Sequence, residues 1–488
     1  MVKLQQQDIE RIRSKAADLV DEYHLPGMSM GVVSGDDLVF SEGFGFADIE
    51  SRRPQAPDVP QRIGSITKVF TGLCAMALVD EGRLSVDDRV LDLLPEIAFH
   101  GPAETLNVWH LMTHTGGIGE APTMANVFDP YTTLWSDVPE IPPISQSYPD
   151  GIEIEATPGT KWCYANHGLG LLGEIVARIE GSSIEEVMKR RVFDPLGMFA
   201  TDLYDQPHPG LGTGYFHAPG HNELDLLELT GQDRMQYRTV DGYNIPGPYV
   251  YVGPRACGSI QSTILDMARF TSALLRRGGG IVKPETFDDM VAPHYCPDDR
   301  MISLGLTFQR IPRFGRRSFG HGGGGGRMYH NAYLSVIPEE DLAVIIHMNF
   351  TSDLLNTIAS RMIQAVLDAP AAEHANSPPA AEILAAAPGV YQVLEGPLTN
   401  YRPVTMTGRV QITAVAGRLF LRSRRGAWRD GLLMLPADRS DPALFALDTG
   451  VAEPPLVALV LDDRRGVKGI RFDRLSYLER NDSLQPWS

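Results

Sequence analysis

Cysteine is scarce in this chain of 488 residues, and the four that occur, Cys74, Cys163, Cys257 and Cys296, lie far apart. None forms a Cys-x-x-Cys pair, so neither a disulfide framework nor a cysteine-bound zinc ion is expected. Long apolar runs are also lacking: no stretch reaches the roughly 18–20 residues that a membrane-spanning helix needs. The first eight residues do not form the apolar core of a secretory signal. The sequence as it stands therefore predicts a soluble, cytoplasmic protein.

Positively charged residues are fewer than negatively charged ones. The chain has 43 Lys and Arg residues against 61 Asp and Glu residues, which gives a formal net charge of −18. This surplus repels phosphate backbones and anionic lipid headgroups, so we expect neither a nucleic-acid partner nor a membrane partner. Hydrophobic residues make up 43% of the chain, an ordinary share for a folded protein, and 488 residues exceed what one core usually holds. More than one structural unit is therefore predicted.

Residues 1–367 are predicted to form a mixed domain. Two strand-like runs flank a turn near the start, helical spacing fills the middle, and strands return before a closing helix. This order is typical of an α+β domain whose antiparallel sheet takes strands from both ends of the segment. The expected helices cover 8–23, 65–81, 167–180, 182–191, 262–277 and 353–367, and the expected strands cover 28–33, 38–46, 329–336 and 342–348.

A change of composition marks a second unit. Residues 368–388 are rich in alanine and proline, which is typical of a semi-stiff linker. Residues 389–488 alternate short apolar runs with Gly, Asp and Arg, which predicts a small antiparallel β domain, either a barrel or a sandwich. Its expected strands cover 404–406, 410–415, 418–421, 432–435, 456–461 and 467–472.

The segment Gly27-Met28-Ser29-Met30-Gly31 matches the Gly-x-Ser-x-Gly pattern of a nucleophile elbow. That pattern works only where a strand precedes the serine and a helix follows it. Here a Leu-Pro break precedes the serine and an alternating strand follows. We therefore interpret the match as glycine and serine at the start of a strand.

A better nucleophile lies at the start of the expected helix 65–81. Ser65 and Lys68 are three residues apart, so a helix places both side chains on one face. A lysine that has lost its charge in a dry cleft can remove the serine proton, and a helix N-terminus favours the negative charge that develops. The alternative is a capping serine followed by a solvated lysine.

Two further segments carry polar groups that suit such a nucleophile. Tyr164 could relay a proton through its phenol while Asn166 holds a substrate carbonyl or the lysine; an N-cap role for Asn166 is the alternative. Five consecutive glycines follow His321. Glycine there lets another backbone or a ligand approach closely, as an oxyanion hole requires. A flexible surface loop is the alternative for this segment.

Three motifs thus occur in order: Ser65-x-x-Lys68, Tyr164-x-Asn166 and His321-x-Gly323. Together they resemble the active-site motifs of the serine β-lactamase and penicillin-binding-protein family. The resemblance is closest to the branch of class C β-lactamases, D-Ala-D-Ala carboxypeptidases and family VIII carboxylesterases. It covers about residues 10–365 and includes the segment 111–117, Leu-Met-Thr-His-Thr-Gly-Gly.

The resemblance implies a β-lactamase-like fold, with an antiparallel sheet flanked by helices and a helical region. It also implies that Ser65 attacks an acyl carbonyl and becomes acylated. Lys68 and Tyr164 would share the general-base work, and Tyr164 would later protonate the leaving group. Asn166 would hydrogen-bond the substrate. Such chemistry needs neither a metal nor an organic cofactor.

The third motif departs from the Lys-Thr-Gly that is usual in the family. His321 replaces the lysine, and Gly322 and Gly324 lack the hydroxyls with which many relatives hold a substrate carboxylate. The resemblance still implies that His321, Gly323 and Gly324 bind substrate, with the backbone N–H groups of Ser65 and Gly324 as the oxyanion hole.

These departures favour a carboxylesterase acting on small to medium esters or amides, and a small-molecule ester or amide is the expected partner. A peptidase or amidase specific for D-amino acids, with β-lactamase side activity, and an acyltransferase are the alternatives. A non-catalytic sensor or scaffold is the alternative of another class. The C-terminal β domain is similar to lipocalin-like domains of some D-peptidases. Its role as a cap, an assembly module or a plain appendage stays open, as do the natural substrate and assembly into a homo-oligomer.

Overall fold

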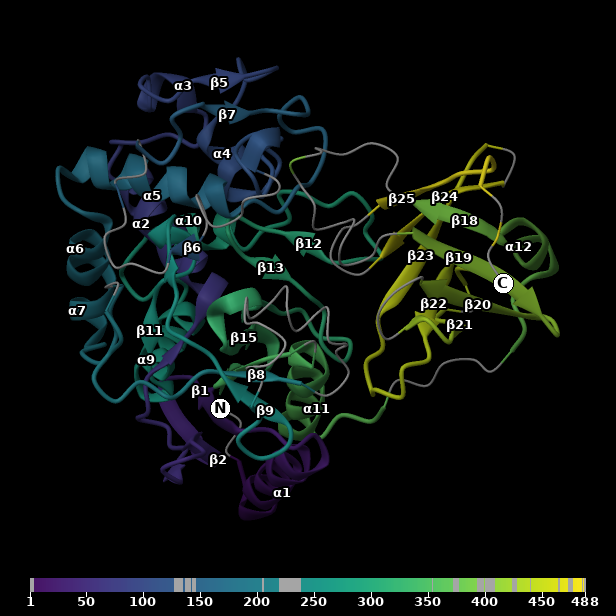
Figure 1. Ribbon diagram of the computed structural model, residues 1–488, viewed down its shortest axis with the longest axis horizontal. Coiled ribbons are helices and arrows are strands. Elements are labelled where there is room, and N and C mark those ends of the chain that lie inside the picture. Colours follow the sequence, from purple (N-terminus) through teal and green to yellow (C-terminus); the bar gives the residue numbers. More distant parts are fainter. Residues whose placement is uncertain are drawn as a thin grey trace.

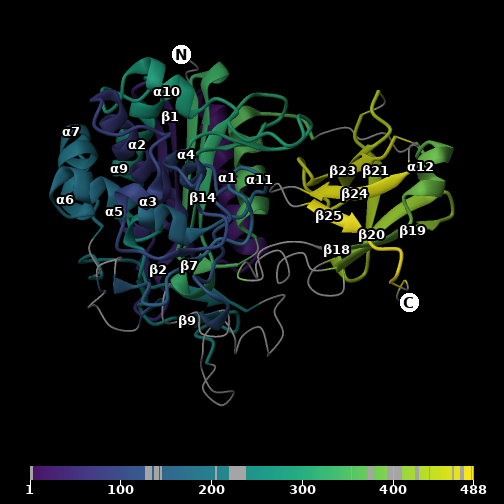
Figure 2. The same ribbon diagram turned by 90° about the horizontal axis from the view of Figure 1, so that it is seen from above.

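The structure is a computed structural model. It describes residues 4–126, 135–136, 142, 146–203, 206–218, 238–352, 354–371, 377–392, 399, 409–423, 428–438, 440–463, 466–472, 477–484 and 486. Figures 1 and 2 show a larger part, in which helices enclose a central sheet, and a smaller part made mostly of strands. The smaller part is the C-terminal end of the chain and lies to one side of the larger part in both views.

Eight strands form the central sheet, in the order β12-β13-β14-β15-β16-β1-β2-β3. β1 (Gly27–Ser34) lies between β2 (Asp37–Asp48) and β16 (Leu342–Met348) and pairs antiparallel with both. The sheet therefore takes strands from both ends of the domain, which confirms the predicted α+β class. β1, β15 (Asn331–Ile337) and β16 are buried along their whole length, because packed layers cover both faces of the sheet.

Helices cover the two faces of this sheet. On one face α1 (Gln6–Glu22) packs against α11 (Leu355–Leu367). On the other face lie α2 (Thr67–Asp80), α5 (Asn166–Glu180) and α9 (Ile264–Leu275). The period of two in β16 sorts its side chains between these layers: Ala343 and Ile345 belong to the second core, and Val344 and Ile346 to the first.

β14 (Phe319–Gly324) lies between β13 and β15 in the sheet, pairs antiparallel with both, and contains the first part of the glycine run. The short turn η1 (Gly64–Ile66) leads into α2 and contacts β14. The remaining elements of the larger part are β3 (Arg53–Pro54), β4 (Gln61–Arg62), α3 (Val90–Leu93), β5 (Phe99–His100), α4 (Val108–Met112), η2 (Met124–Asn126), β6 (Trp135–Ser136), β7 (Ile152–Glu153), α6 (Ile184–Met188), η4 (Lys189–Phe193), α7 (Asp194–Leu196), β8 (Tyr215–His217), β9 (Asn244–Pro246), β10 (Tyr251–Val252), η5 (Arg255–Cys257), β11 (Gln261–Ser262), α10 (Pro284–Met290), β12 (Ser303–Leu304), β13 (Gln309–Arg310), η6 (Gly326–Met328), η7 (Pro338–Glu340) and β17 (Phe350–Thr351).

The C-terminal part is a closed barrel of eight antiparallel strands. Pairing of the first strand with the last closes the barrel and leaves no free sheet edge. The strands are β18 (Gly389–Gln392), β19 (Arg409–Val415), β20 (Arg418–Ser423), β21 (Leu432–Pro436), β22 (Leu444–Leu447), β23 (Leu456–Leu461), β24 (Val467–Phe472) and β25 (Tyr477–Arg480). Of the two predicted alternatives, the structure thus shows the barrel.

Three of these strands, β18, β22 and β25, were not expected from the sequence, and the expected strand 404–406 lies outside the described residues. A short helix, α12 (Ala381–Ala386), forms inside the range predicted as a linker. It forms because Ile383 is apolar and fills a place in the barrel core. This helix therefore belongs to the barrel rather than to a free connection.

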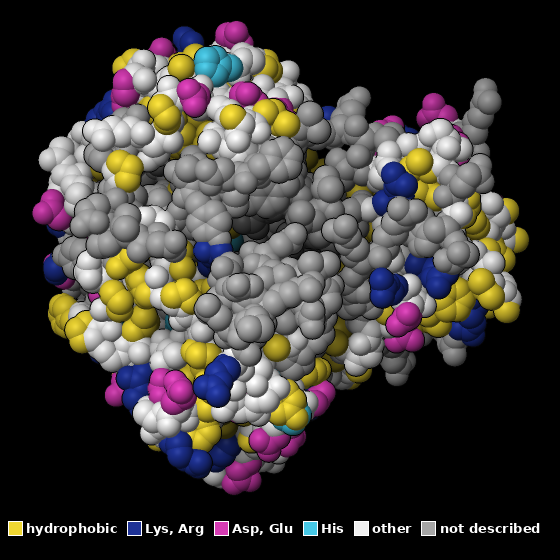
Figure 3. Space-filling view, viewed as in Figure 1, with side chains coloured by type: hydrophobic (Ala, Val, Ile, Leu, Met, Phe, Trp, Pro, Cys, Tyr) yellow, Lys and Arg dark blue, Asp and Glu magenta, His cyan; other side chains and the backbone are white. Residues whose placement is uncertain are grey.

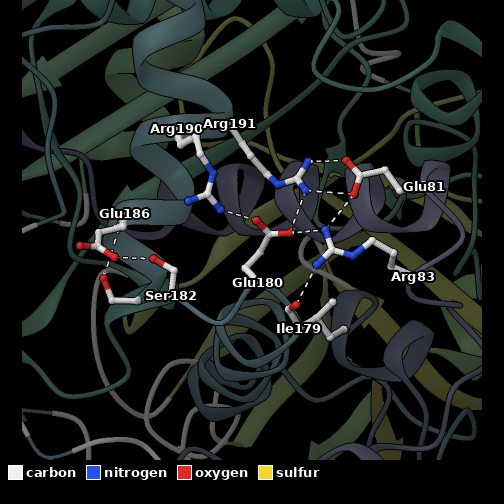
Figure 4. Close-up of polar contacts among 9 residues, drawn as sticks. Glu81, Arg83, Ile179, Glu180, Ser182, Glu186, Arg190 and Arg191 are labelled. Carbon is white, nitrogen blue, oxygen red and sulfur yellow. Dashed lines mark hydrogen bonds and ion pairs between the residues drawn. The ribbon is translucent and has the colours of Figure 1, made fainter.

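An ion-pair cluster ties the C-terminal end of α5 to the end of α2 and to η4 (Figure 4). The Glu180 carboxylate accepts hydrogen bonds from Arg83 and Arg191 at 2.6 and 2.8 Å and also pairs with Arg190. The Arg191 guanidinium, followed by Arg190 and Arg83, lowers the pKa of Glu180 to about 2 against the opposing effect of burial. The cluster holds α5 and α2 in register, and these two helices carry residues of the site described below.

The surface in Figure 3 carries acidic and basic side chains side by side, without a broad field of one sign among the coloured residues. Within the part of the chain that the structure describes, no helix is long and apolar enough to cross a membrane.

Candidate active site

The glycine run brings β14 unusually close to the segment that precedes α2. Gly64 has a left-handed φ of 54°, and a Cβ added to it would lie 2.3 Å from the backbone nitrogen of Gly324. A Cβ added to Gly323 would lie 1.9 Å from the carbonyl oxygen of Ile63 and 3.0 Å from the backbone nitrogen of Ser65. Only glycine fits at these contacts, so the run is a structural requirement for bringing the backbone of β14 against the start of α2.

Lys68 lies one turn after Ser65 and is fully buried. Its Nζ donates hydrogen bonds to Ser65 Oγ at 2.9 Å, to Asn166 Oδ1 at 2.7 Å and to the carbonyl oxygen of Cys257 at 2.8 Å. Three acceptors match the three N–H donors of an ammonium group. The arrangement therefore suits a charged Lys68 whose donors are all used within the protein.

Tyr164 lies on the loop before α5, with its ring over the lysine. Lys68 Nζ is 4.9 Å from the centre of the Tyr164 ring, within the range of a cation–π contact. The ring of His114 also stacks on Tyr164, with a centroid distance of 4.4 Å and an interplanar angle of 29°. The Tyr164 ring thus contacts both a cation and an imidazole.

His114 also fixes the backbone on both sides of Tyr164. The N–H of Ala165 donates to His114 Nδ1 at 3.2 Å, and the N–H of Cys163 donates to the His114 carbonyl at 2.7 Å. His114 has a left-handed φ of 56°, an uncommon conformation for a residue with a Cβ, and strain of this kind clusters at functional sites. In the sequence, the segment 111–117 is the signal that points to His114.

Glu120 is a buried acidic residue that could not be predicted from the sequence; only 2% of its surface is exposed. Asn166 Nδ2 donates to its two oxygens at 3.1 and 3.4 Å. Since Nδ2 faces the carboxylate, Oδ1 must face Lys68, so Glu120 sets the orientation of the Asn166 amide. No motif or spacing in the sequence connects these two residues.

His321 lies on β14 and is 4% exposed. Burial, followed by the nearby Lys68 cation, lowers its pKa to about 3, so the imidazole is neutral at neutral pH. Its ring is 6.4 Å from that of Tyr164, centre to centre. His321, Tyr164 and His114 line one narrow pocket together with Trp162, Thr307 and other residues, none of which is a lysine or an arginine.

The structure brings all seven residues of the predicted site to one place: Ser65, Lys68, Tyr164, Asn166, His321, Gly323 and Gly324. Their catalytic and binding roles stay predictions. Ser29, the serine of the nucleophile-elbow pattern, is fully buried inside β1, as the strand interpretation expected. Among the described residues, no group of three or more His, Cys, Asp or Glu side chains could hold a metal ion.

A residue from the C-terminal part reaches the neighbourhood of Glu120. Thr399, between β18 and β19 in the chain, is fully buried. Its carbonyl accepts from the N–H of Ala121 at 3.1 Å, and its N–H donates to Glu155 Oε1 at 2.6 Å. A Cβ added to Gly119 would lie 2.0 Å from Thr399 Oγ1, so this contact also depends on a glycine.

Comparisons with known proteins agree with this geometry. The family model described as Beta-lactamase matches residues 12–366. Lovastatin esterase from Penicillium rubens is 25% identical over 272 residues, which make up 51% of this chain and 63% of that protein. The chain therefore matches somewhat less than two thirds of the length of this relative.

Two solved structures share the fold. The octameric penicillin-binding protein homologue from Pyrococcus abyssi has a TM-score of 0.62 and 23% identity, and the match covers 97% of this chain and 100% of that one. The D-amino acid amidase from Ochrobactrum anthropi SV3, complexed with L-phenylalanine amide, has a TM-score of 0.59 and 22% identity, with 74% and 99% covered. At these identities the likeness shows the fold alone.

Proposed function

This chain belongs to the β-lactamase family, and from that premise we propose that it is a serine hydrolase that forms an acyl-enzyme at Ser65. The observation that carries the proposal is the hydrogen bond of 2.9 Å from Lys68 Nζ to Ser65 Oγ, at the N-terminal end of a buried helix and beside the Tyr164 ring. A hydroxyl next to a buried amine and a phenol is the arrangement that nucleophilic catalysis needs.

In the acylation step, Ser65 Oγ forms a bond to the acyl carbonyl carbon and gives up its proton. We assign that proton to the oxygen of Tyr164, which passes its own phenol proton on toward the leaving group and so stays neutral, because all three donors of Lys68 are already used and an ammonium has no lone pair to accept a proton. Lys68 then acts as the cation that stabilises the negative charge developing on Ser65 Oγ and on the Tyr164 oxygen during the proton transfer. The bond to the leaving group breaks, and the leaving group takes its proton from Tyr164.

The charge that develops on the substrate carbonyl oxygen needs hydrogen-bond donors. The close approach of β14 to the start of α2 supports the backbone N–H groups of Ser65 and Gly324 as these donors. In the deacylation step, water gives a proton to Tyr164 and attacks the acyl carbon, and Ser65 recovers its hydroxyl hydrogen. Every proton and bond is accounted for by side chains and water, as in other acyl-serine enzymes.

Carboxylic esters are the favoured substrates. The lovastatin esterase relative supports this choice, as does the neutral His321 at the position where the usual motif has a lysine. An amidase or peptidase for D-amino acids is the second candidate, supported by the shared fold of the D-amino acid amidase. A non-catalytic sensor would keep the fold without turnover, and the intact Ser65, Lys68 and Tyr164 cluster argues against it.

The test combines active-site labelling with a substrate panel. A fluorophosphonate probe, followed by mass spectrometry of the intact chain and of its peptides, should modify Ser65 in the wild type and not in Ser65→Ala. Ser29→Ala is the matched control and should be labelled like the wild type, since Ser29 is buried in β1. Hydrolysis of p-nitrophenyl butyrate, a D-alanine anilide and nitrocefin then ranks esterase, amidase and β-lactamase activity. An unlabelled Ser65 and no turnover would favour the sensor.

A further inference from the structure

The hydrogen bonds of His321 decide which of its ring nitrogens carries the proton. Nδ1 lies 2.5 Å from the carbonyl oxygen of Gly322. A carbonyl oxygen only accepts, so Nδ1 must be the protonated nitrogen. In a neutral imidazole the other nitrogen, Nε2, then carries a lone pair and no hydrogen. His321 therefore presents an acceptor, whereas the lysine of the usual motif presents three donors.

Nε2 makes no hydrogen bond with the described residues, although His321 lines the narrow pocket beside Tyr164. A ligand that enters the pocket and offers a hydrogen to Nε2 would complete the hydrogen bonding of this acceptor. Two neutral groups of the same lining also lack a partner among the described residues, the indole N–H of Trp162 and the hydroxyl of Thr307. The Thr307 hydroxyl packs toward Gly72 of α2.

The described residues that line this pocket offer no free cation to a substrate carboxylate. The pocket lining has no lysine or arginine, and the three donors of Lys68 are all used by the protein. Hydroxyl groups cannot be supplied by β14 either. A side chain at 324 would place its Cβ 2.1 Å from Asn331 Oδ1, and a Cβ at 322 would face the side chains of Leu355 and Tyr333.

We propose that His321 Nε2 accepts a hydrogen bond from the substrate, and that the site therefore selects acyl donors with an N–H or O–H group near the scissile bond over those with a carboxylate. This inference rests on the proposed acyl-serine chemistry and adds the substrate class to it. The site favours acyl groups with a hydrogen-bond donor and also disfavours acyl groups with a carboxylate. A donor group completes the hydrogen bonding of Nε2, whereas a carboxylate meets its lone pair while all three donors of the nearby Lys68 are used by the protein.

Three p-nitrophenyl esters test the proposal, because they share a leaving group and differ in the acyl part. The ester of N-acetylglycine offers an N–H, the monoester of succinic acid offers a carboxylate, and the ester of butyric acid offers neither. Each kcat/KM is divided by the second-order rate constant for attack of hydroxylamine on the same ester, because the succinate carboxylate and the acetamido group each speed spontaneous hydrolysis by attacking their own ester carbonyl. The wild type should prefer the N-acetylglycine ester to the succinate ester by at least about tenfold.

Variants at His321 should change the ratio of the N-acetylglycine ester to the succinate ester to different extents. His321→Gln keeps an acceptor at a similar reach and should keep the preference. His321→Leu removes the acceptor, and the ratio should fall to within about threefold of one. His321→Lys introduces donors and should raise kcat/KM for the succinate ester relative to the other two. His100→Lys, which places the same side chain at an exposed histidine outside the pocket, is the matched control and should leave the ratio unchanged.

The outcomes separate the two proposals. Fluorophosphonate labelling of Ser65 in each variant shows whether its site has remained folded, and if His321→Lys fails this check, the wild type and His321→Leu decide. If hydrolysis depends on Ser65 but the wild type prefers the succinate ester, or His321→Leu keeps the wild-type ratio, the assignment of His321 is overturned and the serine hydrolase stands. If no ester is hydrolysed and Ser65 is not labelled, both proposals are overturned.

Discussion

Replacing Gly323 with alanine should inactivate the proposed hydrolase, because the added methyl group has no space between β14 and the segment that leads into α2. The new Cβ would lie 1.9 Å from the Ile63 carbonyl oxygen and 3.0 Å from the Ser65 nitrogen, and both are backbone atoms that no rotamer change can move. Contacts below 3.0 Å essentially never occur for a real Cβ, so the two backbones must separate by about 1 Å.

A separation of this size would displace the backbone N–H groups of Ser65 and Gly324, the proposed donors to the substrate carbonyl oxygen. Loss of one such donor lowers kcat by about 10²–10³-fold in serine hydrolases, and a misplacement of about 1 Å has a comparable effect. We therefore expect kcat of Gly323→Ala to fall by about 10²-fold or more. The assay is hydrolysis of p-nitrophenyl butyrate, together with the rate of fluorophosphonate labelling and the melting temperature.

The neighbouring glycine supplies a matched control for this prediction. A Cβ at Gly322 would have its nearest contact, the Leu355 side chain, at 3.6 Å, which is an ordinary van der Waals distance. Gly322→Ala should therefore keep kcat within about threefold of the wild type. The reasoning would be refuted if Gly323→Ala stayed within that range, or if Gly322→Ala lost as much activity as Gly323→Ala.

Three further variants test individual contacts. Glu120→Gln keeps the shape of the side chain but removes the charge that orients Asn166, so kcat/KM should fall about tenfold at an unchanged melting temperature; wild-type kcat/KM would contradict this role. His114→Asn keeps a residue that tolerates the left-handed backbone but removes the ring stacked on Tyr164. It should lower kcat/KM for ethyl butyrate more than for p-nitrophenyl butyrate, whose leaving group needs no proton, and equal losses would count against it. The lowered pKa of Glu180 implies stability that is fully present above its unfolded value of about 4.5 and is lost as the pH falls through about 2. Glu180→Gln should accordingly be less stable than the wild type by about 2–3 kcal/mol in urea unfolding at pH 7, and the difference should shrink toward pH 2; a difference that does not depend on pH would exclude this origin.

Local sequence patterns were sufficient to predict the helices of the first domain and the strands at its two ends. The helix expected over 65–81 is observed as η1 and α2, and the expected runs 28–33 and 342–348 are β1 and β16. These elements could be predicted because apolar spacing over one segment already determines which face it buries. The strands of the barrel were harder to predict, because β22 and β25 have only four residues each, too few to show a period of two. β22 is defined by its pairing with β21 and β23, and β25 by its pairing with β24 and, where the barrel closes, with β18.

The sequence by itself determined that Ser65 and Lys68 can touch, because a separation of three residues on a helix is fixed by the geometry of one turn. It did not determine the Cys257 carbonyl that completes the donors of Lys68, the Glu120 carboxylate that orients Asn166, or the His114 ring against Tyr164. The two residues of each of these pairs are separated by 46 to 189 positions in the chain. Contacts over such separations depend on how the sheet and the helices pack as a whole, and no short-range pattern records that packing.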